Sequence, residues 1–162
     1  MVIRPAAPED HDAIRTVVIA AFGRPDEASL VDALRADGDA LVELVAVMDD
    51  AVVGHILFSP LTTDTGARFA ALAPLSVAPD RQKDGLGMML MQVGHELCRT
   101  AGVEAVIVLG HPAYYPRVGY SAEAAKTVTA PFKGPSFMAL ALKPGALDTP
   151  VTVTYAKAFG LA

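Results

Sequence analysis

The spacing of apolar and polar residues predicts an alternation of strands and short helices. Apolar residues recur every three to four positions in 8–22 and 27–36, the pattern of amphipathic helices, after a short first strand at 2–5. Apolar runs bounded by glycine, proline and polar clusters predict strands at 41–48, 52–61, 69–78, 103–109, 137–142 and 151–155. Residues 49–51 join the first two of these strands, which predicts an antiparallel hairpin. We expect an α/β (α+β) protein with a mixed sheet.

The most informative stretch, residues 72–91, runs from a strand through a glycine turn into a helix. Gln82, Gly85 and Gly87 fall where backbone N–H groups point outward at a helix N-terminus, and the glycines leave the approach clear. This arrangement predicts a cradle for a phosphate or another anion. Pro74 lies inside the preceding strand and cannot donate a ladder hydrogen bond, so we expect a bulge or a splayed edge there.

The helix that begins at residue 86 has an apolar side and a polar side. Its apolar residues recur at spacings of three and four: Leu86, Met89, Leu90, Val93, Leu97 and Ala101. We expect this side to pack on the sheet, and we expect Gln92, His95, Glu96 and Arg99 to face solvent. A strand, a helix and a second strand of this length predict that 103–109 pairs parallel to 69–78.

Two well-known phosphate-binding turns do not match this stretch. A P-loop requires lysine and then serine or threonine after its last glycine, but Met88 and Met89 follow Gly87. A dinucleotide fingerprint requires a third glycine, where Leu90 stands, and an acidic residue at the end of the next strand, but no Asp or Glu closes 103–109. A strand, a glycine turn and a helix also occur in proteins that bind no nucleotide there, so the turn alone leaves both readings open.

The motif Gln-x-x-Gly-x-Gly is complete at Gln82, Gly85 and Gly87, directly after Leu-Ser-Val-Ala-Pro at 75–79. It resembles the cofactor motif of the GNAT superfamily of N-acetyltransferases. A second segment, 112–120, reads PAYYPRVGY and resembles the signature of the YhbS-type branch of that superfamily. His111 departs from the aspartate expected in that branch. Softer matches at 137–140 and 145–147 extend the resemblance from about residue 3 to residue 159.

The resemblance implies a GNAT fold, with a mixed central sheet of about seven strands, helices on both faces and a splayed parallel strand pair. It implies acetyl-CoA as co-substrate, with the diphosphate on the glycine turn and the pantetheine arm beside the proline-interrupted strand. The cofactor residues would be Leu75, Ser76, Val77, Gln82, Lys83, Asp84, Gly85, Leu86, Gly87 and Met88. The N–H of Val77 would also polarise the thioester carbonyl.

Transfer of an acetyl group from a thioester to an amine also needs an acid for the departing thiolate. A tyrosine, with a pKa of about 10, is still protonated at neutral pH and can donate to a thiolate. We expect Tyr115 to be this acid, with Tyr114 as the alternative. For the base that takes the ammonium proton, Glu27, His55 and His111 remain open, with Glu27 favoured because its helix would border the acceptor cleft.

Composition narrows the class of protein further. The 162 residues have the length of a single domain, 1–162, and the mean hydropathy of +0.39 comes without an apolar run of the roughly 18 to 20 residues that a membrane helix needs. The start of the chain lacks a secretion signal pattern, so we expect a soluble cytoplasmic protein. A net charge of −5 with scattered basic residues argues against nucleic-acid binding.

The remaining candidate side chains point to packing. Cys98, the single cysteine, is expected to be buried, and the four histidines at 11, 55, 95 and 111 lack the spacing of metal ligands, so we expect no metal. Two functions compete: an acetyl-CoA-dependent N-acetyltransferase acting on a primary amine, and a non-catalytic acyl-CoA-binding or sensing module. The acceptor amine, on a small molecule or a protein, stays open. Pairing of the last strands in a homodimer is compatible with such a fold.

Overall fold

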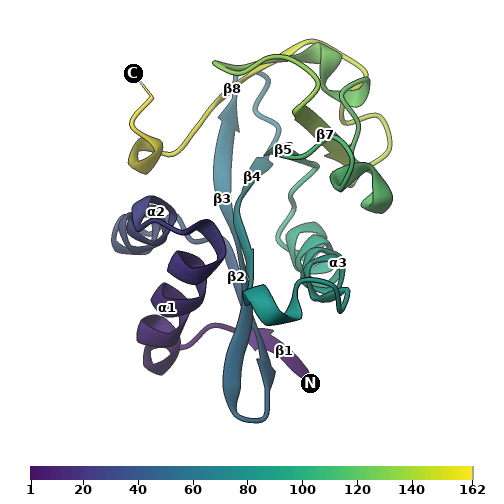
Figure 1. Cartoon of the computed structure of the whole chain (residues 1–162). Helices are drawn as coiled ribbons and strands as arrows, with labels where there is room; N and C mark the ends of the chain where they lie inside the picture. The colour runs from purple at the N-terminus through teal and green to yellow at the C-terminus, as the bar shows by residue number, and fades with distance from the viewer. Residues whose placement is uncertain (162) are drawn as a thin grey trace. The chain divides into compact units, whose positions relative to one another are not determined.

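The computed structural model describes residues 1–161. Within these residues the α-helices are α1 (His11–Phe22), α2 (Asp26–Ala36) and α3 (Leu86–Thr100). The strands are β1 (Val2–Pro5), β2 (Val42–Met48), β3 (Ala51–Thr63), β4 (Phe69–Val77), β5 (Ala105–Leu109), β6 (Val128–Thr129), β7 (Phe137–Ala141) and β8 (Val151–Thr154). Short 3-10 helices are η1 (Pro8–Asp10), η2 (Pro79–Arg81), η3 (Tyr115–Val118), η4 (Ala124–Thr127) and η5 (Lys157–Phe159). The order of these elements follows the predicted one (Figure 1).

The strands form a mixed sheet in the order β1-β2-β3-β4-β5-β7, with β8 pairing β3 and β6. Strands β4 and β5 are parallel, as the strand–helix–strand order predicts, and all of their paired residues on β4, Phe69 to Ala71, precede Pro74. The expected α/β class with a mixed sheet is confirmed. The described residues contain eight strands instead of about seven, because β6 is a two-residue strand that is too short to leave an apolar pattern.

The hairpin between β2 and β3 has the predicted connection. Met48 pairs with Ala51, and the two residues between them, Asp49 and Asp50, have φ angles of 50° and 63°. Two successive left-handed residues are the signature of a type I′ turn, whose twist matches that of the flanking strands. Aspartate tolerates this conformation better than most residues. The turn sets the pairing next to it, and the register shifts between Ala46 and Val47.

The chain forms two compact units. The first contains residues 1–58 and 73–94, and the second contains residues 59–72 and the chain from residue 95 onward. The sequence prediction of one domain over 1–162 stays a prediction.

In the first unit, successive residues of β3 face opposite helices. A β-carbon added at Gly54 would lie 3.0 Å from Cδ1 of Leu90 on α3, so that side of the strand meets α3. The next residue, His55, bonds to Glu43 of β2, and Arg35 of α2 holds the same carboxylate. Helices therefore cover both faces of this part of the sheet, as predicted. The helices α1 and α2 lie beside each other on their face (Figure 1).

A charged network links α2 to the β2–β3 hairpin within that unit. Arg35 donates two hydrogen bonds to the Glu43 carboxylate, from Nε to Oε1 at 3.0 Å and from Nη2 to Oε2 at 2.7 Å. His55 Nε2 lies 2.8 Å from Glu43 Oε2, and the His55 side chain is 0% exposed. Burial raises the pKa of Glu43, but the hydrogen bonds from His55 and Arg35 outweigh it and bring the pKa to about 2. Burial lowers the pKa of His55, so its ring is neutral and donates from Nε2.

Helix α3 buries a different side from the predicted one. Val93 and Leu97, expected in the core, are each 38% exposed, whereas His95, expected in solvent, is 5% exposed. The reason is Gly94: a β-carbon there would lie 2.3 Å from Cε1 of Phe58. The missing side chain lets the buried Phe58 ring lie against the helix backbone, and the helix turns toward its glycine side. The buried α3 residues are Leu86, Gly87, Leu90, Met91, Gly94, His95 and Cys98.

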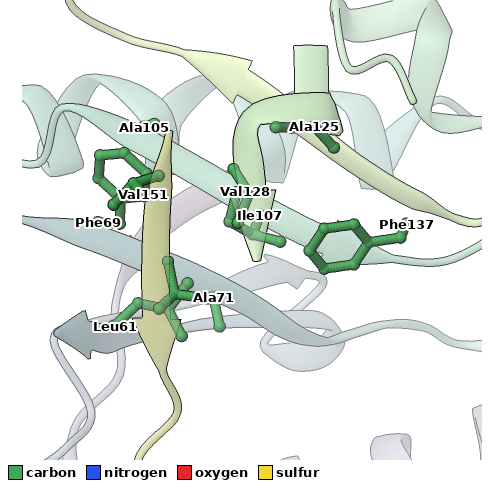
Figure 2. Close-up of a cluster of buried hydrophobic side chains, with 11 residues drawn as sticks. Leu61, Phe69, Ala71, Ala105, Ile107, Ala125, Val128, Phe137 and Val151 are labelled. Atoms are coloured by element: carbon green, nitrogen blue, oxygen red, sulfur yellow. The ribbon is translucent and has the colours of Figure 1, made fainter. Parts of the chain in front are cut away.

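The second unit has its own apolar core. Its buried members come from every strand of that unit and from η4: Leu61, Phe69, Ala71, Ala105, Ile107, Ala125, Val128, Phe137, Ala139, Val151 and Val153 (Figure 2). The short strands β6 and β8 pair in parallel, Val128 opposite Val151, and contribute valines to this core. On β8 the buried valines alternate with exposed threonines, the period-2 pattern of a strand with one buried face.

Replacing Gly94 with alanine should destabilise the protein by about 1 to 2 kcal/mol. Overpacking against the Phe58 ring costs about 1 to 3 kcal/mol, and the better helix propensity of alanine returns up to about 1 kcal/mol. Urea unfolding followed by circular dichroism measures the change. The double variant Gly94→Ala with Phe58→Leu should recover part of the loss, because leucine lacks the ring edge that clashes. An unchanged or raised midpoint in the single variant would contradict the close contact.

Replacing Glu43 with glutamine should lower the free energy of unfolding at pH 7 by about 3 kcal/mol, because Arg35 loses its buried carboxylate partner and keeps only the exposed Asp32 at 3.4 Å. In the wild type, Glu43 has a folded pKa of about 2 against an ordinary 4.5. Its stabilisation is therefore present above pH 4.5 and is lost as the pH falls toward 2. The difference in free energy of unfolding between wild type and variant should therefore disappear as the pH falls from 4.5 toward 2. The exposed Glu9→Gln serves as control, with a change below about 0.5 kcal/mol. A gap that is independent of pH would rule out the assigned role of Glu43.

Candidate active site

The glycine turn predicted to hold an anion lies in the first unit, between η2 and α3. Gln82, Lys83, Asp84 and Gly85 are all exposed, and α3 begins at the next residue. Gly85 has a φ of +77°, which favours glycine, and a β-carbon added there would meet no atom within 4 Å. The turn therefore presents backbone to an open approach.

The start of α3 supplies donors for that approach. The first bond that returns to the turn runs from the N–H of Met89 to the carbonyl of Gly85, at 3.2 Å. The N–H groups of the first turn, from Leu86 to Met88, have no carbonyl partner inside the helix and carry the positive end of its dipole. These residues fit the diphosphate of a nucleotide-like ligand by the chemistry of the donor set. Asp84 adds a carboxylate to the same turn, and Nη1 of Arg81 lies 3.9 Å from it.

A side chain joins the turn to the end of β4. Nε2 of Gln82 donates a hydrogen bond of 3.3 Å to the carbonyl oxygen of Val77. Leu75 and Val77 are half-buried, while Ser76 between them is buried, and its Oγ has no hydrogen-bond partner among the described residues. The predicted cofactor residues of β4 and of the turn are thus brought together, and Gln82 makes the connection.

The two tyrosines predicted as acids lie in the second unit. The short helix η3 begins at Tyr115, with Pro116 in its first turn, where a proline is well tolerated. The rings of Tyr114 and Tyr115 meet edge to face, with centroids 5.1 Å apart. Burial raises the pKa of Tyr115 to about 12, with a further contribution from Tyr114, so the phenol stays protonated at neutral pH.

A buried histidine–tyrosine pair beside these residues was not predicted. His95 Nε2 lies 2.6 Å from the hydroxyl of Tyr120, which is 1% exposed. Burial, with a smaller effect from Arg99, lowers the pKa of His95 to about 4, so the ring is neutral. The prediction that His95 faces solvent is therefore wrong, because α3 turns toward Gly94. The one available signal was the Gly87–Gly94 spacing of seven residues, which marks the small-residue side of the helix.

The candidate bases differ in their surroundings. Arg24 donates to Glu27 from Nε at 3.0 Å and from Nη2 at 2.6 Å, and this pairing lowers the pKa of the carboxyl. His55 is fully buried on the Glu43 carboxylate, and its Nδ1 has no hydrogen-bond partner among the described residues. His111 is exposed. As predicted, Cys98 is buried, and burial raises its pKa to about 12.

The described residues contain neither a metal-binding cluster nor a membrane-spanning helix. Within residues 1–161, no three His, Cys, Asp or Glu side chains gather into a group that could hold a metal ion. No helix in the same part of the chain has the length and apolar character needed to cross a bilayer.

The chain is similar to known proteins of one family. The model of the acetyltransferase (GNAT) family matches residues 11–120. The uncharacterized N-acetyltransferase YjhQ of Escherichia coli K12 is 40% identical over 68% of this chain, and the match spans 64% of that relative, less than two thirds of its length. YhbS of the same strain, also an uncharacterized N-acetyltransferase, is 34% identical over 74% of this chain and 73% of its own.

Two solved structures resemble the whole chain. YhbS from Escherichia coli, crystallised in complex with CoA, has a TM-score of 0.90 at 31% identity and covers 99% of this chain and 92% of its own. A GNAT family acetyltransferase from Brucella melitensis, in complex with acetyl-CoA, has a TM-score of 0.81 at 36% identity. It covers 98% of this chain and 97% of its own.

The family model matches more than half of the chain. The fold of this chain, its glycine turn and its tyrosine segment are in keeping with that family. The chain therefore belongs to the GNAT family of acetyltransferases.

Proposed function

We propose that this protein is an acetyl-CoA-dependent N-acetyltransferase that acts on a primary amine. The observation that carries the proposal is the exposed glycine turn at the start of α3, joined through Gln82 to the end of β4. Support also comes from relatives: the similar structures from Escherichia coli and Brucella melitensis hold CoA and acetyl-CoA.

The turn and the strand end would hold two parts of the co-substrate. The backbone N–H groups from Gln82 to Met88 would hold the diphosphate, helped by the dipole of α3, with Lys83 screening its charge. The backbone of Leu75 and Val77 would pair with the amides of the pantetheine arm. The N–H of Val77, at the end of β4, would polarise the thioester carbonyl.

Bound acetyl-CoA supplies an acetyl thioester, which the amine attacks as the C–N bond forms and the C–S bond breaks. We infer direct attack without an acetylated cysteine, because Cys98 is buried and its pKa of about 12 keeps it a thiol at neutral pH. Tyr115 would protonate the departing thiolate. Its phenol is protonated at neutral pH, and burial, which raises its pKa to about 12, makes it a weaker acid than an exposed tyrosine.

Glu27 is proposed to take the proton from the acceptor ammonium. The paired Arg24 lowers the pKa of this carboxyl, so the pair must open, or a water must relay the proton, before Glu27 acts as a base. Experiment decides whether the amine belongs to a small molecule or to a protein. An amine panel containing a peptide N-terminus, a lysine peptide and a polyamine, read by mass spectrometry of the acetylated products, tests the proposal directly. Absence of acetylated product from every amine would favour the non-catalytic acyl-CoA-binding function.

Acetyl-CoA at about 100 times its Kd should stabilise the fold by about 2.7 kcal/mol and raise Tm by several degrees. Gly85→Asp should abolish that rise, because it puts a carboxylate into the open space where the diphosphate would lie. The matched control is Gly66→Asp: Gly66 has a φ of +83° and also has no atom within 4 Å of an added β-carbon. Differential scanning fluorimetry compares the three proteins. Equal ligand-induced shifts in both variants would place the nucleotide elsewhere.

Tyr115→Phe should lower kcat by about 100-fold or more, while KM for acetyl-CoA changes by less than about threefold, because only the proton donor is removed. Release of free thiol in the presence of an amine from the panel measures the rate. Tyr155→Phe is the matched control, since Tyr155 is also largely buried, packs edge to face on Phe132, and has its pKa raised to about 12. Wild-type turnover in Tyr115→Phe would refute the acid assignment and leave Tyr114 as the alternative.

A further inference from the structure

The hydrogen bond between His95 and Tyr120 ties the segment that carries Tyr115 to helix α3. Both partners belong to the second unit, and the joined atoms, His95 Nε2 and the Tyr120 hydroxyl, are 2.6 Å apart. The rings also pack, with centroids 5.5 Å apart at 52°. Each of the two side chains is at most 5% exposed, so water does not compete for the bond.

The same segment is held from the opposite direction by β7. Ser121 and Ala139 exchange two backbone hydrogen bonds, from Ser121 N–H at 3.1 Å and from Ala139 N–H at 3.0 Å. Tyr120 comes directly before this bridge, and its N–H donates to the carbonyl of Tyr115 at 3.4 Å. The backbone around Tyr120 is therefore fixed on both sides, which leaves its ring with few alternative positions.

Tyr120 in turn packs on Tyr115. The two ring centroids are 5.8 Å apart at 82°, an edge-to-face contact. On another side, a β-carbon added at Gly110 would lie 2.3 Å from Cε2 of Tyr115, so the Tyr115 ring lies against backbone that carries no side chain. Tyr114 makes a further edge-to-face contact. The Tyr115 ring is thus confined by a glycine backbone and two aromatic rings.

The chemistry of the pair suits a support better than a reacting group. Phenylalanine at 120 would fill the same space, so packing alone does not require the hydroxyl. A neutral imidazole beside a phenol satisfies both buried polar groups without placing a charge in the core. The hydroxyl thus fixes the rotation of Tyr120 relative to α3, and a fixed Tyr120 fixes the surface on which Tyr115 packs.

We propose that His95 and Tyr120 are positioning residues that hold the Tyr115 ring, and hence its hydroxyl, in place for proton transfer. The inference rests on the proposed function, in which Tyr115 donates the proton to the thiolate. Neither residue is assigned contact with the substrates. His95 acts on Tyr120, and Tyr120 acts on Tyr115.

The test compares His95→Leu, Tyr120→Phe and the conservative His95→Gln, whose amide can still bond to the Tyr120 hydroxyl. We expect kcat to fall by about tenfold in the first two, with KM for acetyl-CoA within about twofold, because misplacing an acid affects the reaction and not the binding. His95→Gln should keep kcat within about threefold of the wild type. Cys98→Ala, on the same buried side of α3, controls for altered packing and should leave kcat unchanged.

A second measurement observes Tyr115 without a reaction. The chain has four tyrosines, so protein labelled with 13C at Cζ of tyrosine gives four signals that Tyr→Phe variants assign. His95→Leu and Tyr120→Phe should shift or broaden the Tyr115 signal, whereas the Tyr155 signal should stay in place. An unchanged Tyr115 signal together with wild-type kcat in both variants would overturn the inference.

The failure of the proposed acid is distinguishable from the failure of this inference. If Tyr115→Phe alone keeps wild-type kcat, the proposed function of Tyr115 fails, and the NMR arm still decides whether the pair positions its ring. If Tyr115→Phe is slow, His95→Leu added to it should cause no further loss, since there is no hydroxyl left to position. A further tenfold loss in that double variant would show that His95 acts by another route and would overturn the inference.

Discussion

The contact between the Phe58 ring and the bare backbone of Gly94 determines how helix α3 is seated. A helix can approach a sheet most closely where it has no side chain. Helix α3 does so at Gly94, where an added β-carbon would clash with the Phe58 ring. Val93 and Leu97 therefore lie toward solvent, and Met91 lies in the core beside the predicted Leu90 and Cys98. The same contact also carries His95, the residue after Gly94, into the interior. Without that contact the predicted amphipathic side would be the buried one.

Two buried polar networks follow from the way the helices pack, and each gives a histidine a different kind of hydrogen-bond partner. On the first unit's sheet, His55 donates to the Glu43 carboxylate, whose charge Arg35 balances. In the second unit, neutral His95 bonds to the hydroxyl of Tyr120. The first network links a helix to a hairpin through charge, and the second links a helix to an aromatic segment through neutral groups. Burying a histidine is inexpensive only with such a partner.

The proposed chemistry divides between backbone and side chains. Anion binding relies on N–H groups at the start of α3, which any residue supplies provided that the turn is open, and Gly85 keeps it open. Proton transfer relies on one phenol whose ring is confined by its neighbours. The buried thiol of Cys98 takes no part because its pKa is raised to about 12. A protein with this division tolerates many changes around the anion site and few around the aromatic rings.

Much of the fold was predictable from local pattern. The helices, the long strands, the Asp49–Asp50 hairpin and the parallel β4–β5 pair follow from apolar spacing and turn chemistry, because these depend on neighbours in the chain. The glycine turn at Gly85 and the tyrosines of 112–120 were visible for the same reason. One strand was missed: β6, with two residues, is too short to show a period.

The side of α3 that is buried could not be predicted, because both sides carry apolar residues and the choice depends on a ring that lies 36 positions away in the chain. The sequence by itself determined the elements, their order, the glycine turn and the family motifs, all of which are local or patterned. Only the tertiary structure decided that His95 meets Tyr120 and that Arg35 and His55 share Glu43. Partners of buried polar groups are chosen by three-dimensional packing, which leaves no period in the sequence.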